Sequence, residues 1–396
     1  MHNEFSGLTK AAFWTRFALG LFIFTISTVF VAITGQARAA SYSMTVLDDI
    51  AYLGGINNRG EILGAGGSFS TLLWSGGITE GISVPGSQYP QPDALNDTSQ
   101  IAGYVFNSST NDGYPFLWDN GQVIPLLPTS SAVVRVRALN NAGQALLTNN
   151  TILENGVQTP VDTHNIVPID SPLPVFLHAL NDAGQVVGNA PIRPDGNYHA
   201  IMTQDGITVD LGTLPNTNYS DAITINNLGQ VAGISQNPSH TYGFIWQDGT
   251  MTDLGSLGGS LVSPTAMNNR GVIVGQATVG SGPTNGFVWS AQSGMQNLNA
   301  LVDGTNHELT ITWPVDINDN GWIIAYAEDA SKNPHSVLLK PISVPEPDAL
   351  AIAGIGAAIL LAWRMRCRVE AALATRAHSR HTLLCPRNER SHAQGS

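Results

Sequence analysis

The chain has 396 residues, with 29 acidic against 17 basic side chains and a formal net charge of −12. Between Ala40 and Ser343 there are 24 acidic against 7 basic residues, so this segment repels phosphate backbones and no nucleic-acid partner is expected. The two cysteines, Cys367 and Cys385, lie near the C-terminus, which excludes a disulfide framework or a cysteine metal site elsewhere. No cofactor is expected.

The N-terminus has the pattern of an export signal. Basic residues precede an apolar run from Phe17 to Thr34, and the small-x-small sequence Ala37-Arg38-Ala39 follows. This pattern predicts that residues 1–39 are a signal peptide cleaved before Ala40. The alternative is an uncleaved anchor, because the apolar run is long enough to span a bilayer.

One phrase of the type Ile-Asn-Asn-x-Gly returns seven times after the leader. The copies are INNRGEILGAG from Ile56, LNDTSQIAGYV from Leu95, LNNAGQALLTN from Leu139, LNDAGQVVGNA from Leu180, INNLGQVAGIS from Ile225, MNNRGVIVGQA from Met267 and INDNGWIIAYA from Ile317. In the fourth copy, Asn181 starts a type I turn and Gly184 takes the left-handed position after it. With apolar residues on both sides, each copy predicts a hairpin of two strands.

A second phrase follows each copy after a polar gap, as in YGFIWQDGTMTDLG from Tyr242. Asn120-Gly121, Asn155-Gly156 and Asp248-Gly249 are two-residue turn signals within it, so a second hairpin is expected. Each repeat therefore supplies four short strands. The apolar runs show little alternation, as expected for sheets that are covered on both faces.

The repeat length and the chain ends predict a closed ring. Successive copies are spaced by 39, 44, 41, 45, 42 and 50 residues, a period typical of propeller blades. The strand at Met44 to Asp48 lacks its partner, and so does the strand from His335 to Lys340. Pairing them completes an all-β, seven-bladed β-propeller of four-stranded blades over residues 43–340. An open β-solenoid is the alternative, and it would not need two unpaired strands at the chain ends that match each other.

The repeat resembles the HAF repeat of bacterial extracellular proteins. That family has a His-Ala-Phe-like strand, a Trp, a DLG-x-LGG stretch and an IN-x-x-G-x-x-VG phrase, and Tyr242 to Gly275 matches this order nearly throughout. The copies near Leu139 and Ile317 depart from it, because Leu147 and Ala325 stand where other copies have Gly. The resemblance brings no established catalytic residue.

The connections between hairpins gather the long variable segments at one end of the strands, the end where binding is expected. The Asn-Asp pairs lack the alternating acidic spacing of a calcium loop, so turn formation explains them and no metal site is predicted. The histidines show no zinc spacing, and those that begin a strand, His199 and His335, are expected to be structural. Sugar stacking is conceivable for the recurring tryptophans, but packing between blades is the favoured role. They are Trp74, Trp118, Trp246 and Trp289.

The C-terminus carries a second signal. Val344-Pro345-Glu346-Pro347 ends a linker over 341–348, and residues 349–368 hold an apolar segment followed by Arg364, Arg366 and Arg368. Its 15 apolar residues, Ala349 to Trp363, would span ~22 Å as a helix, short of the ~30 Å bilayer core, although the arginines can snorkel. A transmembrane helix with its basic end in the cytoplasm is predicted.

This order of parts resembles the PEP-CTERM sorting signal of Gram-negative bacteria. The resemblance implies processing by an exosortase, a membrane enzyme that acts on such tails. Residues 369–396 depart from the family, whose members end soon after the Arg cluster, and they show no strand or helix pattern. They are either an unstructured extension or a shifted reading frame. A permanent one-pass anchor is the alternative to a processed tail.

Two functions from different classes are compatible with this sequence. The first is a non-enzymatic protein of the cell envelope or extracellular matrix, which binds polysaccharide or surface proteins through the long-loop face. The second is a propeller enzyme that hydrolyses or cleaves extracellular glycans, which would need two carboxylates brought together by folding. The first is favoured because the acidic residues fall mostly at turns.

Overall fold

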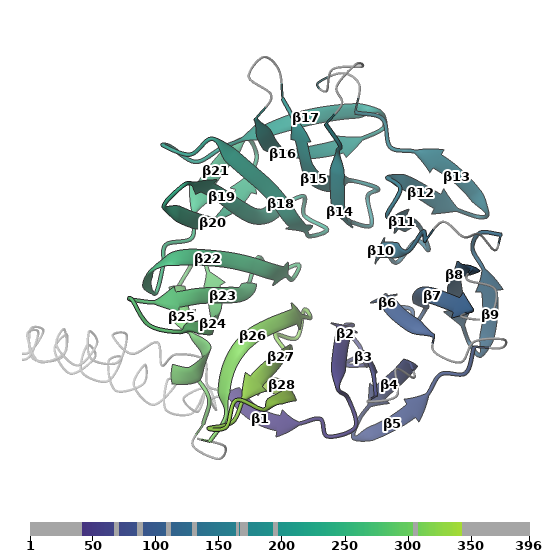
Figure 1. Cartoon of the computed structure of the whole chain (residues 1–396), viewed down its shortest axis with the longest axis horizontal. Coiled ribbons are helices and arrows are strands. Elements are labelled where there is room, and N and C mark those ends of the chain that lie inside the picture. Colours follow the sequence, from purple (N-terminus) through teal and green to yellow (C-terminus); the bar gives the residue numbers. More distant parts are fainter. Residues whose placement is uncertain are drawn as a thin grey trace, which may run out of the picture. The chain divides into compact units, whose positions relative to one another are not determined.

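The computed structural model describes residues 42–66, 71–84, 90–107, 112–128, 133–163, 166, 173–192, 197–303 and 308–342. These residues form an all-β propeller, in which four-stranded antiparallel units follow one another around a common axis (Figure 1). A single turn of 3₁₀ helix, Leu298–Ala300, is the one helical element in this part of the chain.

The strands follow the repeat in chain order. The first three units contain β2 (Tyr52–Ile56), β3 (Ile62–Ala65), β4 (Thr71–Ser75), β5 (Ile78–Gly81); β6 (Gln91–Leu95), β7 (Ile101–Asn107), β8 (Asp112–Asp119), β9 (Gln122–Pro125); and β10 (Val136–Leu139), β11 (Ala145–Leu147), β12 (Thr151–Glu154), β13 (Val157–Pro160). The next three contain β14 (Phe176–Leu180), β15 (Val186–Pro191), β16 (Tyr198–Gln204), β17 (Ile207–Gly212); β18 (Tyr219–Ile225), β19 (Val231–Asn237), β20 (His240–Gln247), β21 (Thr250–Asp253); and β22 (Gly258–Met267), β23 (Ile273–Val279), β24 (Thr284–Ser290), β25 (Gly294–Asn297). The last unit contains β26 (Thr310–Ile317), β27 (Ile323–Glu328) and β28 (Pro334–Pro341), with β1 (Tyr42–Val46) from the N-terminal side.

The predicted turns are confirmed. Gly184 has φ of 77°, the left-handed conformation that glycine adopts without steric cost. In five of the second hairpins, both turn residues have positive φ, as in Asn120 (48°) and Gly121 (83°) or Asp248 (49°) and Gly249 (84°). This is the type I′ geometry, whose twist matches that of the flanking strands.

The first strand of each unit faces the axis and the fourth faces outward (Figure 1). Between the units, aromatic and aliphatic side chains of the second and third strands are fully buried, among them Phe116, Phe244 and Phe287. Most of the fourth strands are largely exposed, as β13 is along its whole length, whereas β25 is half-buried and β1 has buried side chains. Apolar packing between neighbouring units therefore stabilises the ring, which explains why the second and third strands are apolar without alternation.

The predicted latch is confirmed. β1 pairs antiparallel with β28, with Met44 opposite Leu339, so the first strand of the chain completes the last unit. Tyr42 and Met44 are buried in the core of this unit. The backbone of Tyr42 also exchanges hydrogen bonds with Leu301 (2.8 Å) and Asp303 (2.9 Å). The N-terminal strand is thus held from two sides.

The expectation of seven separate blades needs a correction. Five sheets have four strands each, but the units β18–β21 and β22–β25 are joined into one eight-stranded sheet. A parallel bridge between Thr241 of β20 and Leu261 of β22 makes this connection. It arises because β22, with ten residues, is longer than the other first strands and reaches the third strand of its neighbour.

The junction between the last unit and the first contains a carboxylate that has no counterpart in the repeat. Asp316 stands where the other copies have Gly, Ala or Thr, and it faces Gly55, which leaves room for it. Its two oxygens accept hydrogen bonds from the backbone N–H groups of Ile56 (2.9 Å) and Ile317 (2.8 Å). Burial nevertheless raises the pKa of Asp316 to about 6.

This pKa gives the junction a pH dependence. The folded pKa lies above the usual value of 3.8, so protonated Asp316 favours the folded state and its contribution is lost as pH rises from about 4 through 6. The loss amounts to at most about 3 kcal/mol. We expect the unfolding free energy of the wild type to fall more steeply between pH 4.5 and 7 than that of Asp316→Asn, as measured by urea denaturation. Equal slopes would contradict this account of Asp316.

The predicted signal peptide (1–39), the linker (341–348) beyond Ile342, the transmembrane helix (349–368) and the tail (369–396) lie outside the described residues. Among the residues that are described, no helix has the length and hydropathy needed to cross a bilayer.

Candidate functional site

The repeated phrase builds a closed ring of buried asparagines around the axis. Each first Asn of the phrase donates from Nδ2 to the backbone oxygen of its counterpart in the next unit, at 2.9–3.1 Å. The last of these bonds, from Asn318 to Asn57, closes the circle. The seven members are Asn57, Asn96, Asn140, Asn181, Asn226, Asn268 and Asn318, all buried. The phrase recurs because every unit must supply one link.

The same asparagines fold their own turns. The Oδ1 atom of Asn226 accepts from the backbone N–H groups of Leu228 and Gln230, both at 3.0 Å. Its Nδ2 atom also donates to Oε1 of Gln230 at 2.7 Å. Gln230 then donates to Gln247 at the end of β20, which ties the turn to the third strand. The Gln of the phrase is therefore part of the turn, a role that the sequence did not reveal.

The third residue of the phrase, which is Asn or Asp, forms another closed ring. The backbone N–H of each donates to Oδ1 of its counterpart in the next unit, at 2.7–3.0 Å. Asn and Asp alternate along most of the ring, and amides donate to the carboxylates beside them, as Asn141 does to Asp97 (3.1 Å) and Asp182 (2.9 Å). In circular order the members are Asn58, Asp97, Asn141, Asp182, Asn227, Asn269 and Asp319.

These two rings line a cavity of about 180 Å³ on the axis. The Asn-Asp pairs that the sequence analysis tested as calcium ligands are engaged here in turn and ring hydrogen bonds. Across the described part of the chain, no three His, Cys, Asp or Glu side chains are grouped so as to hold a metal ion. The rings are thus a structural closure rather than a candidate site.

The opposite end of the first strands is built differently. Each first strand has a β-bulge three residues before its ring Asn, and the bulged residues include Asp93, Arg137 and His178 of three successive units. Bulges re-aim side chains and occur near functional sites. Here they bring ionisable groups of neighbouring units together at the end where the long connections lie.

Two polar clusters result from these bulges. In the first, Arg135, which directly precedes β10, forms an ion pair with Asp93 of β6 and donates to Gln91 at 2.8 Å. Burial raises the pKa of Asp93, although the Arg135 guanidinium opposes this shift. In the second cluster, His178 of β14 lies between Arg137, with Nδ1 at 3.4 Å from its Nη1, and Asp221, with Nε2 at 3.2 Å from its Oδ1.

A cavity of about 390 Å³ lies beside the second cluster, between the units β14–β17 and β18–β21. Three aromatic rings line it, with centroids 6.1 Å apart for Phe176 and Tyr198 and 6.4 Å apart for Tyr198 and Tyr219. His178, Asp221 and Asn189 are its remaining lining residues. Burial raises the pKa of Tyr219, and the nearby carboxylate of Asp221 adds to the shift.

Exposed aromatic side chains stand at the same end. Each copy of the phrase begins with an Ile, Leu or Met, directly before the ring Asn. The residue four positions before that apolar residue is Tyr52 in β2, Phe176 in β14 and Trp313 in β26, and the exposed fractions of these side chains are 51%, 41% and 51%. In the other units this position is Gln91, Arg135, Asp221 or Ser263. We call these three aromatic residues, with the two polar clusters, the long-loop mouth of the propeller.

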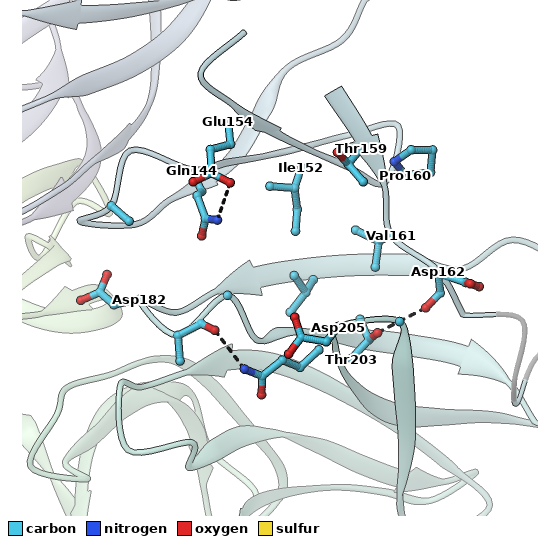
Figure 2. A pocket seen from close by; sticks show the side chains of 16 residues that line it. Gln144, Ile152, Glu154, Thr159, Pro160, Val161, Asp162, Asp182, Thr203 and Asp205 are labelled. Carbon is cyan, nitrogen blue, oxygen red and sulfur yellow. Dashed lines mark hydrogen bonds between the residues drawn. The ribbon is translucent and has the colours of Figure 1, made fainter. Parts of the chain in front are cut away.

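On the opposite side of the ring, the grooves between units are lined by polar side chains that hydrogen-bond to one another. Figure 2 shows the groove of about 570 Å³ between the units β10–β13 and β14–β17, where Gln144 donates to Glu154 at 3.1 Å. A groove of about 730 Å³ occupies the equivalent place beside Gln230 and Gln247, which are joined in the same way. Recurrence at equivalent positions indicates that such grooves belong to the packing of the repeat.

The tryptophans and histidines named from the sequence lie in different environments in the structure. The tryptophans Trp74 and Trp289 are buried in the cores between units, which confirms their packing role. His199 begins β16 and contacts Asp210 at 3.1 Å, and His335 lies in β28, so both are strand residues as predicted. His178 instead lines the cavity, which the sequence analysis did not anticipate.

The sorting and cleavage residues cannot be placed. They are Ala37, Ala39, Ala40, Val344, Pro345, Glu346, Pro347, Arg364, Arg366 and Arg368, and all lie outside the described residues.

Comparison with known proteins finds distant likenesses among solved structures. No family model matches the chain, and no curated protein does. Among solved structures, the chain is similar to the β-propeller domain of the Trilobed protease from Pyrococcus furiosus, with 11% identity, a TM-score of 0.47, and coverage of 75% of this chain and 100% of that one. Putative TolB from Agrobacterium tumefaciens shows 11% identity, a TM-score of 0.39, and coverage of 58% and 78%. Dipeptidyl peptidase 4 from Porphyromonas gingivalis shows 9% identity, a TM-score of 0.41, and coverage of 82% and 62%.

The sheet order and the latch of the chain itself define it as a β-propeller.

Proposed function

We propose that this protein is a non-enzymatic, exported protein of the cell envelope or extracellular matrix, which binds a polymer or protein partner at the long-loop mouth. The observation that carries the proposal is the set of half-exposed aromatic residues Tyr52, Phe176 and Trp313 at one end of the ring. Large aromatic side chains left in water at a shared position, beside Arg and Asp, have the composition of binding hot spots.

The sorting role rests on the sequence alone. Export would follow from the signal peptide over 1–39, and retention from the VPEP linker and the apolar segment with its arginines. An exosortase-type enzyme is the proposed processing partner. Because β28 ends at Pro341, removal of the chain from Val344 onward would leave every described strand in place.

The aromatic residues of the mouth give the direct test. We expect Trp313→Ala to weaken binding of the full-length protein to extracellular polysaccharide or envelope proteins from its native host by about tenfold or more, because a truncated aromatic hot spot costs at least about 1–2 kcal/mol. Binding would be measured by biolayer interferometry on immobilised fractions.

The matched control is Leu228→Ala. Leu228 is 68% exposed in a turn of the opposite end, and its replacement should leave binding unchanged. Equal losses in both variants, or binding that Trp313→Ala does not alter, would place the partner elsewhere.

A further inference from the structure

Asn189 in the cavity has an unusual position for a buried amide. It is 2% exposed, its Nδ2 donates to the hydroxyl of Tyr219 at 2.8 Å, and its Oδ1 has no hydrogen-bond partner among the described residues. A buried acceptor left unpaired costs about 1–3 kcal/mol. Since the side chain lines the cavity, a donor supplied by a ligand would recover part of that cost.

The neighbouring side chains supply a second hydrogen-bond acceptor, the carboxylate of Asp221, and they determine which nitrogen of His178 carries the proton. Arginine only donates, so the contact from Arg137 makes Nδ1 of His178 the acceptor and leaves the proton on Nε2. That nitrogen faces Oδ1 of Asp221 at 3.2 Å. The two atoms do not form a hydrogen bond, so Oδ1 of Asp221 is a buried acceptor without a partner among the described residues, and a ligand can donate to it.

The charge and shape of the cavity select among ligands. The carboxylate of Asp221 is balanced by Arg137 on the far side of His178, so neither an anion nor a cation is favoured. Phe176, Tyr198 and Tyr219 offer flat apolar faces beside these acceptors. A ligand that donates several hydrogen bonds, carries no charge and has an apolar ring face meets all three conditions. A neutral sugar ring has this chemistry.

We propose that the cavity between the units β14–β17 and β18–β21 binds a neutral hexose unit of a polysaccharide, with Tyr198 as the stacking platform and Asp221 and Asn189 as the hydroxyl acceptors. This inference rests on the proposed binding function and names its ligand. The volume of about 390 Å³ falls within the ~300–1,000 Å³ typical of small-molecule pockets. Phe176 and His178, which belong to the long-loop mouth, line the cavity, so the sugar site lies inside the mouth.

The test uses the full-length protein in detergent and a panel of neutral polysaccharides: a β-1,4-glucan, an α-1,4-glucan, a β-1,3-glucan and a galactomannan. Affinity gel electrophoresis measures the dissociation constant for each. We expect at least one to bind, and we expect Tyr198→Ala and Asp221→Asn each to raise that dissociation constant by about tenfold or more. Asn189→Ala should do the same, but it also removes a buried bond to Tyr219, so the other two variants carry the test.

Gln276→Ala is the matched control, since Gln276 follows Gly275 in β23 as Asn189 follows Gly188 in β15, and binding should not change. If no neutral polysaccharide binds, or if Tyr198→Ala and Asp221→Asn bind as the wild type does, the sugar site is wrong. Binding of poly-L-lysine alone would overturn it in favour of an amine ligand. A partner lost in Trp313→Ala but kept in Tyr198→Ala would retain the proposed function while rejecting the sugar site.

Discussion

Replacing Asn226 with alanine is expected to lower the free energy of unfolding by about 3–5 kcal/mol, a large effect for one substitution. The side chain makes four hydrogen bonds within a buried ring. Its loss leaves two N–H groups of the turn without their side-chain partner and removes one of the two hydrogen bonds that the backbone oxygen of Asn268 accepts. Both the turn of one unit and its link to the next are then weakened, so the cost exceeds that of an ordinary lost bond.

The measurement is chemical denaturation followed by tryptophan fluorescence. Asn227→Ala is the matched control, because Asn227 is adjacent in sequence but exposed, and water can replace its bonds to Asp182. We expect a change below about 1 kcal/mol for this variant. Similar destabilisation by the two substitutions would show that the buried ring has no special part in stability.

Removal of the first strand is expected to have the largest effect of all. A chain that begins at Ile50 lacks the whole of β1 and with it the buried side chains of Tyr42, Met44 and Leu47. At about 1.5–3 kcal/mol for each buried side chain, the loss is on the order of 6 kcal/mol. The edge of β28 also becomes an unpaired strand, which favours association between copies.

We expect such a chain to melt at least 10 °C below one that begins at Ser41, and to dimerise or aggregate in size-exclusion chromatography. Addition of a synthetic peptide of residues 41–49 should restore part of the lost melting temperature, because the peptide can occupy the vacated edge of β28. Unchanged melting after the deletion would rule out the latch as a source of stability.

Much of the fold follows from local patterns in the sequence. Glycine and Asn-Gly signals mark the turns, because few other residues adopt positive φ, and their spacing sets the strand lengths. The latch was predictable because a strand at Met44 and a strand at His335 each lacked a partner. The joining of β20 to β22 was not, since it depends on where two strands of different units end in space.

Most of the candidate site could not be predicted from the sequence. His178 and Asp221 belong to different units, and only the packing of β14 beside β18 brings them to 3.2 Å. The role of Asn189 depends on a missing hydrogen bond, which no sequence pattern records. One signal was available: aligning the repeats places Tyr52, Phe176 and Trp313 at the same position, where an exposed aromatic side chain has no structural need to recur.

The second ring of polar residues limits where a further repeat can be added to the propeller. Strict alternation of amide and carboxylate requires an even number of members, and this ring has seven, so one like pair is unavoidable. That pair is Asn227 with Asn269, which still share a hydrogen bond of 2.8 Å, whereas two adjacent aspartates would repel each other. Insertion of a repeat that carries aspartate at this position would therefore be tolerated best at this mismatch, where the added aspartate would complete the alternation. Elsewhere on the circle, an inserted repeat would leave the original mismatch in place and create another.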